Sequence, residues 1–247
     1  ERKIQHIFKK AETDCKSAMM IIDLDNFRII NESYGHEIGD IVLKVISGRI
    51  RNICQQDAMS RFVARYSGDE FLMIVKNRKL TADDALVREV LASCNQPIPL
   101  KELMQTETIL PGDKIESLVT YLGVGIAVSD GKSSFRRLVQ NAVVAINTAK
   151  KAGSNSACVY EEAMQEDVHR NNRIRDLLLD AMKNDGFYML YQPQIDIQKG
   201  TVSGTEALVR LKKERISPGL FIPVAEKEGF IRRIGRITTR LVIEQIV

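Results

Sequence analysis

The sequence has no tryptophan, six prolines and only four cysteines among its 247 residues. The cysteines are scattered and form no CxxC pair, which argues against a zinc ribbon or a thioredoxin-like motif and is typical of reduced thiols in a cytoplasmic protein. Long apolar runs are also missing. No run approaches the roughly 20 residues needed to cross a bilayer, so we expect no membrane contact from this segment, although a membrane anchor elsewhere in a longer protein would be compatible with it.

A strong charge of one sign is lacking as well. Lys and Arg number 36 against 32 Asp and Glu, for a net charge of +4, and no basic cluster stands out. Nucleic acid is therefore not an expected partner. Hydrophobic residues at 44% and charged residues at 28% fit one large or two smaller globular domains. Because the chain starts at Glu1 without methionine, we expect it to be part of a longer protein with a sensory segment upstream.

Hydrophobic periodicity predicts a mixed α/β (α+β) sheet flanked by helices over residues 1–161. Apolar runs predict strands, with a β-hairpin at 61–75, and i, i+3, i+4 spacing predicts helices. The expected strands are 18–22, 61–67, 71–75, 119–128 and 157–160, and the expected helices are 3–16, 27–33, 40–50, 82–94 and 134–151. Asp40 is expected to be the N-cap of its helix, after a loop at 34–39.

The pattern changes near residue 161. The sequence predicts a charged connector helix at 162–185 and the beginning of a second domain at 186–247. That second domain is expected to contain strands at 187–193 and 202–211 followed by helices at 221–227 and 231–246.

Acidic residues stand where two of the apolar strands end. Asp23 and Asp25 follow one buried run, and Asp69 and Glu70 occupy the tip of the hairpin, next to Gly68. Adjacent carboxylates repel one another unless solvent or a cation screens them, and carboxylates at neighbouring strand ends can converge on Mg²⁺ (or Mn²⁺). The alternatives are a capped strand end and a solvated acidic turn.

Several of these segments resemble the GGDEF domain of diguanylate cyclases. The matching segments are Asp-Leu-Asp-Asn-Phe-Arg-Ile-Ile-Asn at 23–31, Tyr-Gly-His at 34–36, Gly39-Asp40, Arg-Tyr-Ser-Gly-Asp-Glu-Phe at 65–71 and Ala-Lys-x-x-Gly-x-Asn at 149–155. The resemblance covers about residues 1–161. It implies a fold related to polymerase palms and nucleotidyl cyclases, and the condensation of two GTP into cyclic di-GMP and two pyrophosphates by a homodimer.

The resemblance also implies roles for the acidic residues. Asp23 and the carbonyl of Leu24 would bind Mg²⁺. Asp69 would be both a metal ligand and the base for the 3′-hydroxyl, with Glu70 beside it as ligand and catalytic group. Arg28, which stands where the family usually has lysine, would be a catalytic cation near the phosphates.

A second set of residues would bind the substrate. By resemblance, Asn31 and Asp40 would read the guanine edge, Lys150 would hold the triphosphate, and the backbone of Ser67 and Gly68 would pass over the nucleotide.

The chain departs from the family pattern at other places besides Arg28. Ser67 replaces the first glycine of the motif, Ser154 replaces an arginine, and Ala58 and Arg61 occupy the positions of the Arg-x-x-Asp product-inhibition motif. These departures keep a second hypothesis open, that of a weak or inactive GTP-binding module that regulates an attached phosphodiesterase. A purely structural scaffold is a third.

The second domain resembles the beginning of an EAL domain, the cyclic di-GMP phosphodiesterase. The matching segments are Tyr-Gln-Pro at 191–193, Gly-x-Glu-Ala-Leu-x-Arg at 204–210, Phe-Ile-Pro-Val-Ala-Glu at 221–226 and Gly229. The resemblance implies the first strands and helices of an incomplete TIM-like barrel, with Glu206 as a metal ligand and Gln192 and Arg210 contacting the dinucleotide. Because such a barrel takes roughly 250 residues, we expect no phosphodiesterase activity from this chain alone.

Overall fold

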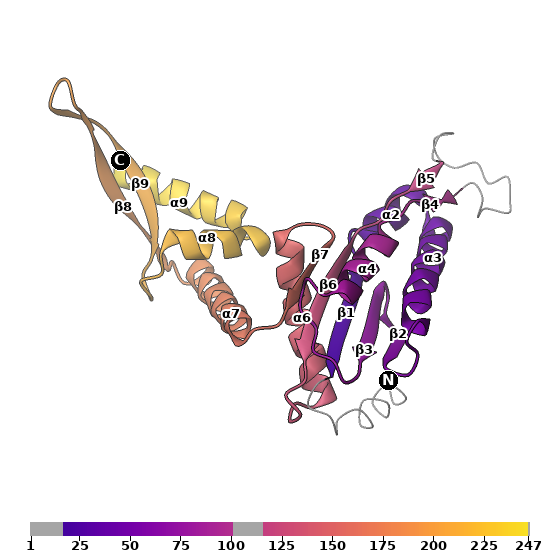
Figure 1. Cartoon of the computed structure of the whole chain (residues 1–247). Helices are drawn as coiled ribbons and strands as arrows, with labels where there is room; N and C mark the ends of the chain where they lie inside the picture. The colour runs from indigo at the N-terminus through magenta and orange to yellow at the C-terminus, as the bar shows by residue number, and fades with distance from the viewer. Residues whose placement is uncertain (1–16, 101–115, 247) are drawn as a thin grey trace. The chain divides into compact units, whose positions relative to one another are not determined.

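The computed structural model describes residues 17–100 and 116–246. The chain divides into two compact units, residues 1–165 and residues 166–247 (Figure 1). The predicted helix at 3–16 lies outside the described residues. Within the described ranges, no helix has the length and apolar character required to span a membrane.

The first unit is built on a five-stranded sheet in the order β2-β3-β1-β6-β7. The central strand β1 (Ala18–Leu24) is antiparallel to β3 (Glu70–Val75) on one side and to β6 (Leu122–Val128) on the other. At the edges, β2 (Arg61–Ser67) pairs with β3, and β7 (Ser156–Val159) pairs in parallel with β6. The mixed α/β sheet expected from the sequence is confirmed.

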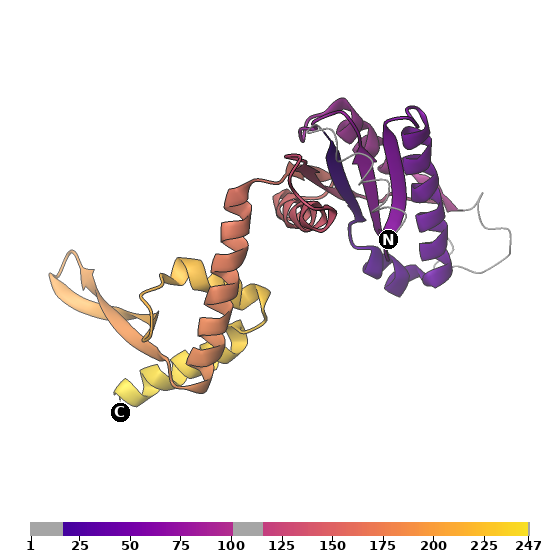
Figure 2. The same ribbon diagram turned by 90° about the horizontal axis from the view of Figure 1, so that it is seen from below.

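Helices and two short strands complete the unit. They are α2 (Phe27–Tyr34), α3 (His36–Gln55), α4 (Ala85–Cys94), β4 (Ile98–Pro99), β5 (Ser117–Leu118) and α6 (Phe135–Ala152). Alternate residues of β1 face opposite sides of the sheet. Met20 and Ile22 join the core with α3 and α4, whereas Met19 and Ile21 join the core with α6. Figure 2 shows α3 and α6 on opposite faces. Because both faces are covered, the inner strands read as unbroken apolar runs.

The prediction that Asp40 caps α3 is wrong, because this helix begins at His36 and includes Asp40 in its interior. Gly35, with a φ of +85°, turns the chain between α2 and α3 in a single residue. The loop predicted at Gly39 is helical instead. A Cβ at Gly39 would collide with the side-chain oxygen of Asn31, so this glycine makes room for the neighbouring helix.

Two glycines of β6 bring α6 close to the sheet. A Cβ at Gly125 would collide with the backbone oxygen of Ala142 and lie 2.5 Å from the nitrogen of Ile146. A Cβ at Gly123 would lie 3.1 Å and 3.2 Å from Cγ and Cε of Lys150. The helix therefore packs directly on the strand backbone, and the lysine side chain crosses the strand at Gly123.

The second unit combines an antiparallel hairpin with three helices. Ile174 and Leu178, from the second half of the first helix, join its core together with Phe187, Leu211 and Phe221. The strands and helices expected at 187–193, 202–211, 221–227 and 231–246 are present, with the two strands paired antiparallel. The elements are α7 (Glu162–Lys183), β8 (Phe187–Asp196), β9 (Thr201–Leu211), α8 (Pro218–Lys227) and α9 (Ile231–Ile246).

We predict that Gly125→Ala destabilises the protein by about 3 kcal/mol, because the new methyl group overlaps backbone atoms of α6 and forces the helix away from the strand. Gly48→Ala is the matched control. Gly48 lies within α3, and a methyl group added there would have no neighbouring atom within 4 Å, so alanine there stabilises by about 1 kcal/mol. Urea unfolding measures the free energy of unfolding of both variants. An equal change in this free energy for the two variants would contradict the close packing of α6.

Candidate functional site

An acidic edge forms where β1 ends. Asp23 lies in register with Glu70 of β3 on one side and with Gly123 of β6 on the other. Lys150, from the last turn of α6, donates a hydrogen bond to Asp23, with 2.6 Å between Nζ and Oδ2. The same Nζ lies 4.0 Å from Oδ1 of Asp25. The Asp23 side chain is 17% exposed and that of Lys150 33%, so the pair is half-buried.

The carboxylates at this edge carry an excess of negative charge. Burial raises the pKa of Asp23, the hydrogen bond and charge of Lys150 lower it, and the charges of Asp69 and Asp25 raise it further. Burial likewise raises the pKa of Glu70, and the charges of Asp23 and Asp69 add to that shift. A group of carboxylates with raised pKa values favours additional positive charge, from protons, a metal ion or a ligand.

The hairpin turn between β2 and β3 presents Asp69. Gly68 has a φ of +49°, a conformation that favours glycine, and its carbonyl accepts a hydrogen bond of 2.7 Å from Nε of Arg65. Ser67 is the last residue of β2 and is not among the described residues with positive φ. Serine therefore fits without backbone strain at the position where the family pattern has glycine.

A hollow of about 380 Å³ opens beside this turn. It brings together three of the residues predicted from sequence, namely Arg28, Asn31 and Asp69. Arg28 also forms an exposed ion pair with Glu32, 2.6 Å from Nε to Oε1. Asp40 is exposed on α3 and is not among the lining residues. Leu24 has a buried side chain, and the role of its carbonyl stays a prediction.

Sequence reasoning missed three residues that line the hollow: Phe27, Glu32 and His36. Helical spacing could have predicted Phe27 and Glu32. They lie four residues from the predicted site residues Asn31 and Arg28, and residues four apart share one face of a helix. The sequence around His36 favours a structural histidine over a catalytic base. Its place at the hollow follows from the one-residue turn at Gly35, which the sequence did not predict.

The acidic edge offers carboxylate oxygens, the donor atoms that a hard divalent cation prefers. Asp23 and Glu70 supply carboxylate oxygens from adjacent strands, and Mg²⁺ prefers such oxygens together with phosphates and water. Among the described residues, no three or more Asp, Glu, His or Cys side chains form a ready-made metal site. The ammonium of Lys150 is the positive group in contact with Asp23.

In the second unit, the predicted residues share one face of the β8–β9 hairpin. Gln192 and Glu206 are register partners, and Arg210 lies four residues further along β9. Antiparallel partners and residues two or four apart project to the same side of a sheet. Gln192 and Glu206 are exposed, and Arg210 is half-buried.

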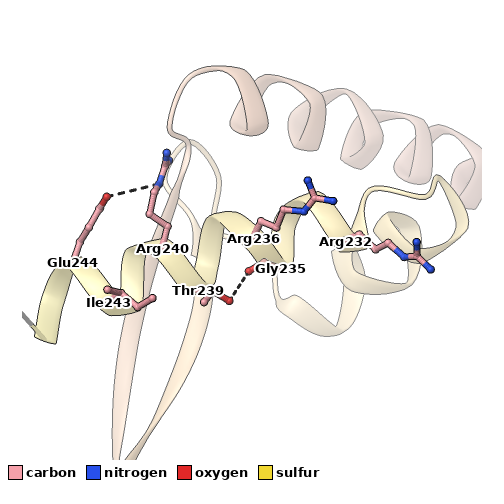
Figure 3. A pocket seen from close by; sticks show the side chains of 7 residues that line it. All are labelled: Arg232, Gly235, Arg236, Thr239, Arg240, Ile243 and Glu244. Atoms are coloured by element: carbon pink, nitrogen blue, oxygen red, sulfur yellow. Dashed lines mark hydrogen bonds and ion pairs between the residues drawn. The ribbon is translucent and has the colours of Figure 1, made fainter.

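A hollow of about 660 Å³ on α9 is separate from that face. Figure 3 shows Arg232, Arg236 and Arg240 extending from this helix. Arg240 forms an ion pair with Glu244, with 3.8 Å between Nε and Oε1. Because this hollow is lined by residues of α9 alone, it does not include the residues predicted to contact a dinucleotide.

Comparison with known families agrees with this division of the chain. Residues 1–156 match the family model described as "Diguanylate cyclase, GGDEF domain", and residues 175–247 match the EAL domain model. The GGDEF match contains the acidic edge and the hollow, and the EAL match contains the hairpin with Glu206.

Two curated relatives with names that refer to cyclic di-GMP match nearly the whole chain. The chain is 29% identical over 239 residues to the bifunctional diguanylate cyclase/cyclic di-GMP phosphodiesterase MucR of Pseudomonas aeruginosa, covering 95% of this chain and 33% of the relative. It is 31% identical over 247 residues to the cyclic di-GMP phosphodiesterase PdeR of Escherichia coli, covering 98% of this chain and 35% of the relative. The chain thus spans about a third of the length of these relatives.

A solved structure agrees with the fold of the first unit. The GGDEF domain of TpbB (YfiN) from Pseudomonas aeruginosa superimposes with a TM-score of 0.55 at 26% identity, covering 68% of this chain and 94% of that chain. The palm-like fold expected from the sequence is confirmed.

Proposed function

We propose, for a chain that belongs to the GGDEF family of diguanylate cyclases and continues into an EAL domain, that the first unit condenses two GTP into cyclic di-GMP and two pyrophosphates. The observation that carries this proposal is the hollow beside Asp69, which lies next to the acidic edge of Asp23 and Glu70. The hollow can hold a base, and the acidic edge can hold the triphosphate through Mg²⁺ bound to its carboxylates.

The hollow supports binding of guanine. Its volume of about 380 Å³ lies within the usual range for small-molecule sites. The Asn31 amide can both donate to and accept from the guanine edge, and Phe27 supplies an apolar surface for the ring. Asp40, which does not line the hollow, would accept from the guanine N–H groups where the base extends toward α3. Arg28, an exposed residue that lines the hollow, would form an ion pair with a phosphate once its ion pair with Glu32 is broken.

The acidic edge supports phosphoryl transfer. The 3′-hydroxyl of one GTP attacks the α-phosphorus of the other, Asp69 accepts the hydroxyl proton, and pyrophosphate leaves. Lys150 meets the negative charge of the triphosphate. Bound Mg²⁺ or Mn²⁺, held by Asp23, the carbonyl of Leu24, Asp69 and Glu70, would add positive charge against the charge that develops on the phosphoryl oxygens. The backbone at the hairpin turn would pass over the nucleotide.

Each copy of the chain would hold one GTP in this hollow, so the reaction needs two copies that face each other. We infer a homodimer whose formation an upstream sensory segment would control. In the second unit, the face with Gln192, Glu206 and Arg210 would contact cyclic di-GMP, with Glu206 as a metal ligand in a complete EAL domain.

A specific observation favours a second candidate, a GTP-binding module that regulates the EAL domain. Arg28 is bonded to Glu32, and Ser154 is exposed and uncharged where the family pattern has arginine. A triphosphate therefore meets fewer positive groups here than in the family pattern. Binding of GTP without turnover would support this candidate.

We predict that Asp69→Asn lowers cyclic di-GMP formation by at least about 10²-fold, because the amide can neither accept the proton nor bind metal as a carboxylate does. The assay is GTP turnover with Mg²⁺ at high protein concentration, with the products resolved by chromatography. Asp83→Asn, at an exposed position before α4, is the matched control and should retain activity. Product formed equally by both variants would contradict the assignment. GTP binding without product from the parent chain would support the regulatory module.

We also predict that Gly39→Ala weakens GTP binding by about tenfold, because its methyl group displaces the Asn31 side chain from the hollow. Gly48→Ala in the same helix meets no neighbouring atom and should leave binding unchanged. Isothermal titration with GTP measures both dissociation constants. Unchanged affinity in the folded Gly39→Ala variant would rule out Asn31 as a guanine contact.

A further inference from the structure

We propose that Lys150 is the counter-ion of Asp23 and prevents free divalent metal from binding this carboxylate. The carboxylate becomes available to metal when a bound triphosphate pairs with Lys150 instead. The part that concerns the triphosphate rests on the proposed function. The part that concerns exclusion of free metal rests on the geometry of the ion pair alone.

The geometry puts the ammonium where a metal ion would have to bind. Nζ of Lys150 lies 2.6 Å from Oδ2 of Asp23 and 4.0 Å from Oδ1 of Asp25, at the edge that Glu70 also faces. Mg²⁺ binds oxygen ligands at about 2.0–2.1 Å. A divalent ion on the Asp23 oxygen would therefore come within close contact of a positive charge, which would repel it.

The fold selects this position for the lysine. Lys150 and Asp23 are 127 residues apart in sequence, and the side chain reaches the carboxylate by crossing the strand at Gly123. A Cβ there would lie only 3.1 Å from Cγ and 3.2 Å from Cε of Lys150. The absence of a side chain at Gly123 therefore leaves space for the aliphatic part of Lys150 to cross β6.

Lys150 can exchange the Asp23 carboxylate for a phosphate. Lysine carries a compact charge on a flexible four-carbon stem, and its side chain is 33% exposed. A triphosphate offers several anionic oxygens in competition with one carboxylate. Once Lys150 turns to the phosphates, Asp23 loses its counter-ion and gains affinity for a cation. Metal and nucleotide then bind cooperatively, because each needs the lysine to have moved.

The test measures Mn²⁺ binding without nucleotide, by the paramagnetic resonance signal of free Mn²⁺, on the whole chain. Lys150→Met removes the charge and keeps the stem, and we expect Mn²⁺ to bind at least about tenfold more tightly than to the parent chain, equivalent to ~1.4 kcal/mol. Lys151→Met is the matched control, because Lys151 is exposed on the same helix, and should leave the affinity unchanged. Lys150→Gln provides a second neutral variant if the methionine variant folds poorly.

Adding Asp23→Asn to Lys150→Met should abolish the gain. Equal Mn²⁺ affinity in the parent and both neutral variants, or a gain that survives Asp23→Asn, would overturn the proposal. The measurement contains no GTP. A chain without cyclase activity can still show the gain, and a chain with full activity can lack it, so the two proposals fail separately.

Discussion

The half-buried ion pair between Asp23 and Lys150 joins the central strand to the helix that covers one face of the sheet. It depends on two glycines of β6. Gly125 lets α6 pack against the strand backbone, and Gly123 lets the lysine cross the strand. Removing one partner of such a pair leaves the other charge uncompensated. The same contact therefore links the end of α6 to β1 and offsets part of the negative charge of the acidic edge, which includes Glu70.

The other half of the site depends on the corner between α2 and α3. A single residue, Gly35, reverses the chain, so His36 begins the new helix beside the face of α2 that carries Phe27 and Asn31. Gly39 leaves space for the Asn31 amide. The hollow is therefore formed by this corner together with Asp69 of the hairpin turn.

Much of the fold could be predicted from the sequence, because residues 18–22 and 71–75 of the buried strands are unbroken apolar runs and α6 has clear helical periodicity. The start of α3 could not, because a glycine in a helix and a glycine in a loop look alike until the packing partner is known, as at Gly39. The motif residues predicted the acidic edge. The contact between Lys150 and Asp23 could not be predicted, because it depends on how α6 lies across β6.

The measurement that tests this account most directly is a crystal structure of the chain with Mg²⁺ and a GTP analogue that cannot react. The account predicts the guanine in the hollow next to Asn31, the metal on Asp23, and Lys150 bonded to phosphate, with its Nζ beyond the hydrogen-bond limit of about 3.5 Å from Asp23. Nucleotide bound away from Asp69, or Lys150 still bonded to Asp23 with the nucleotide and metal in place, would contradict it.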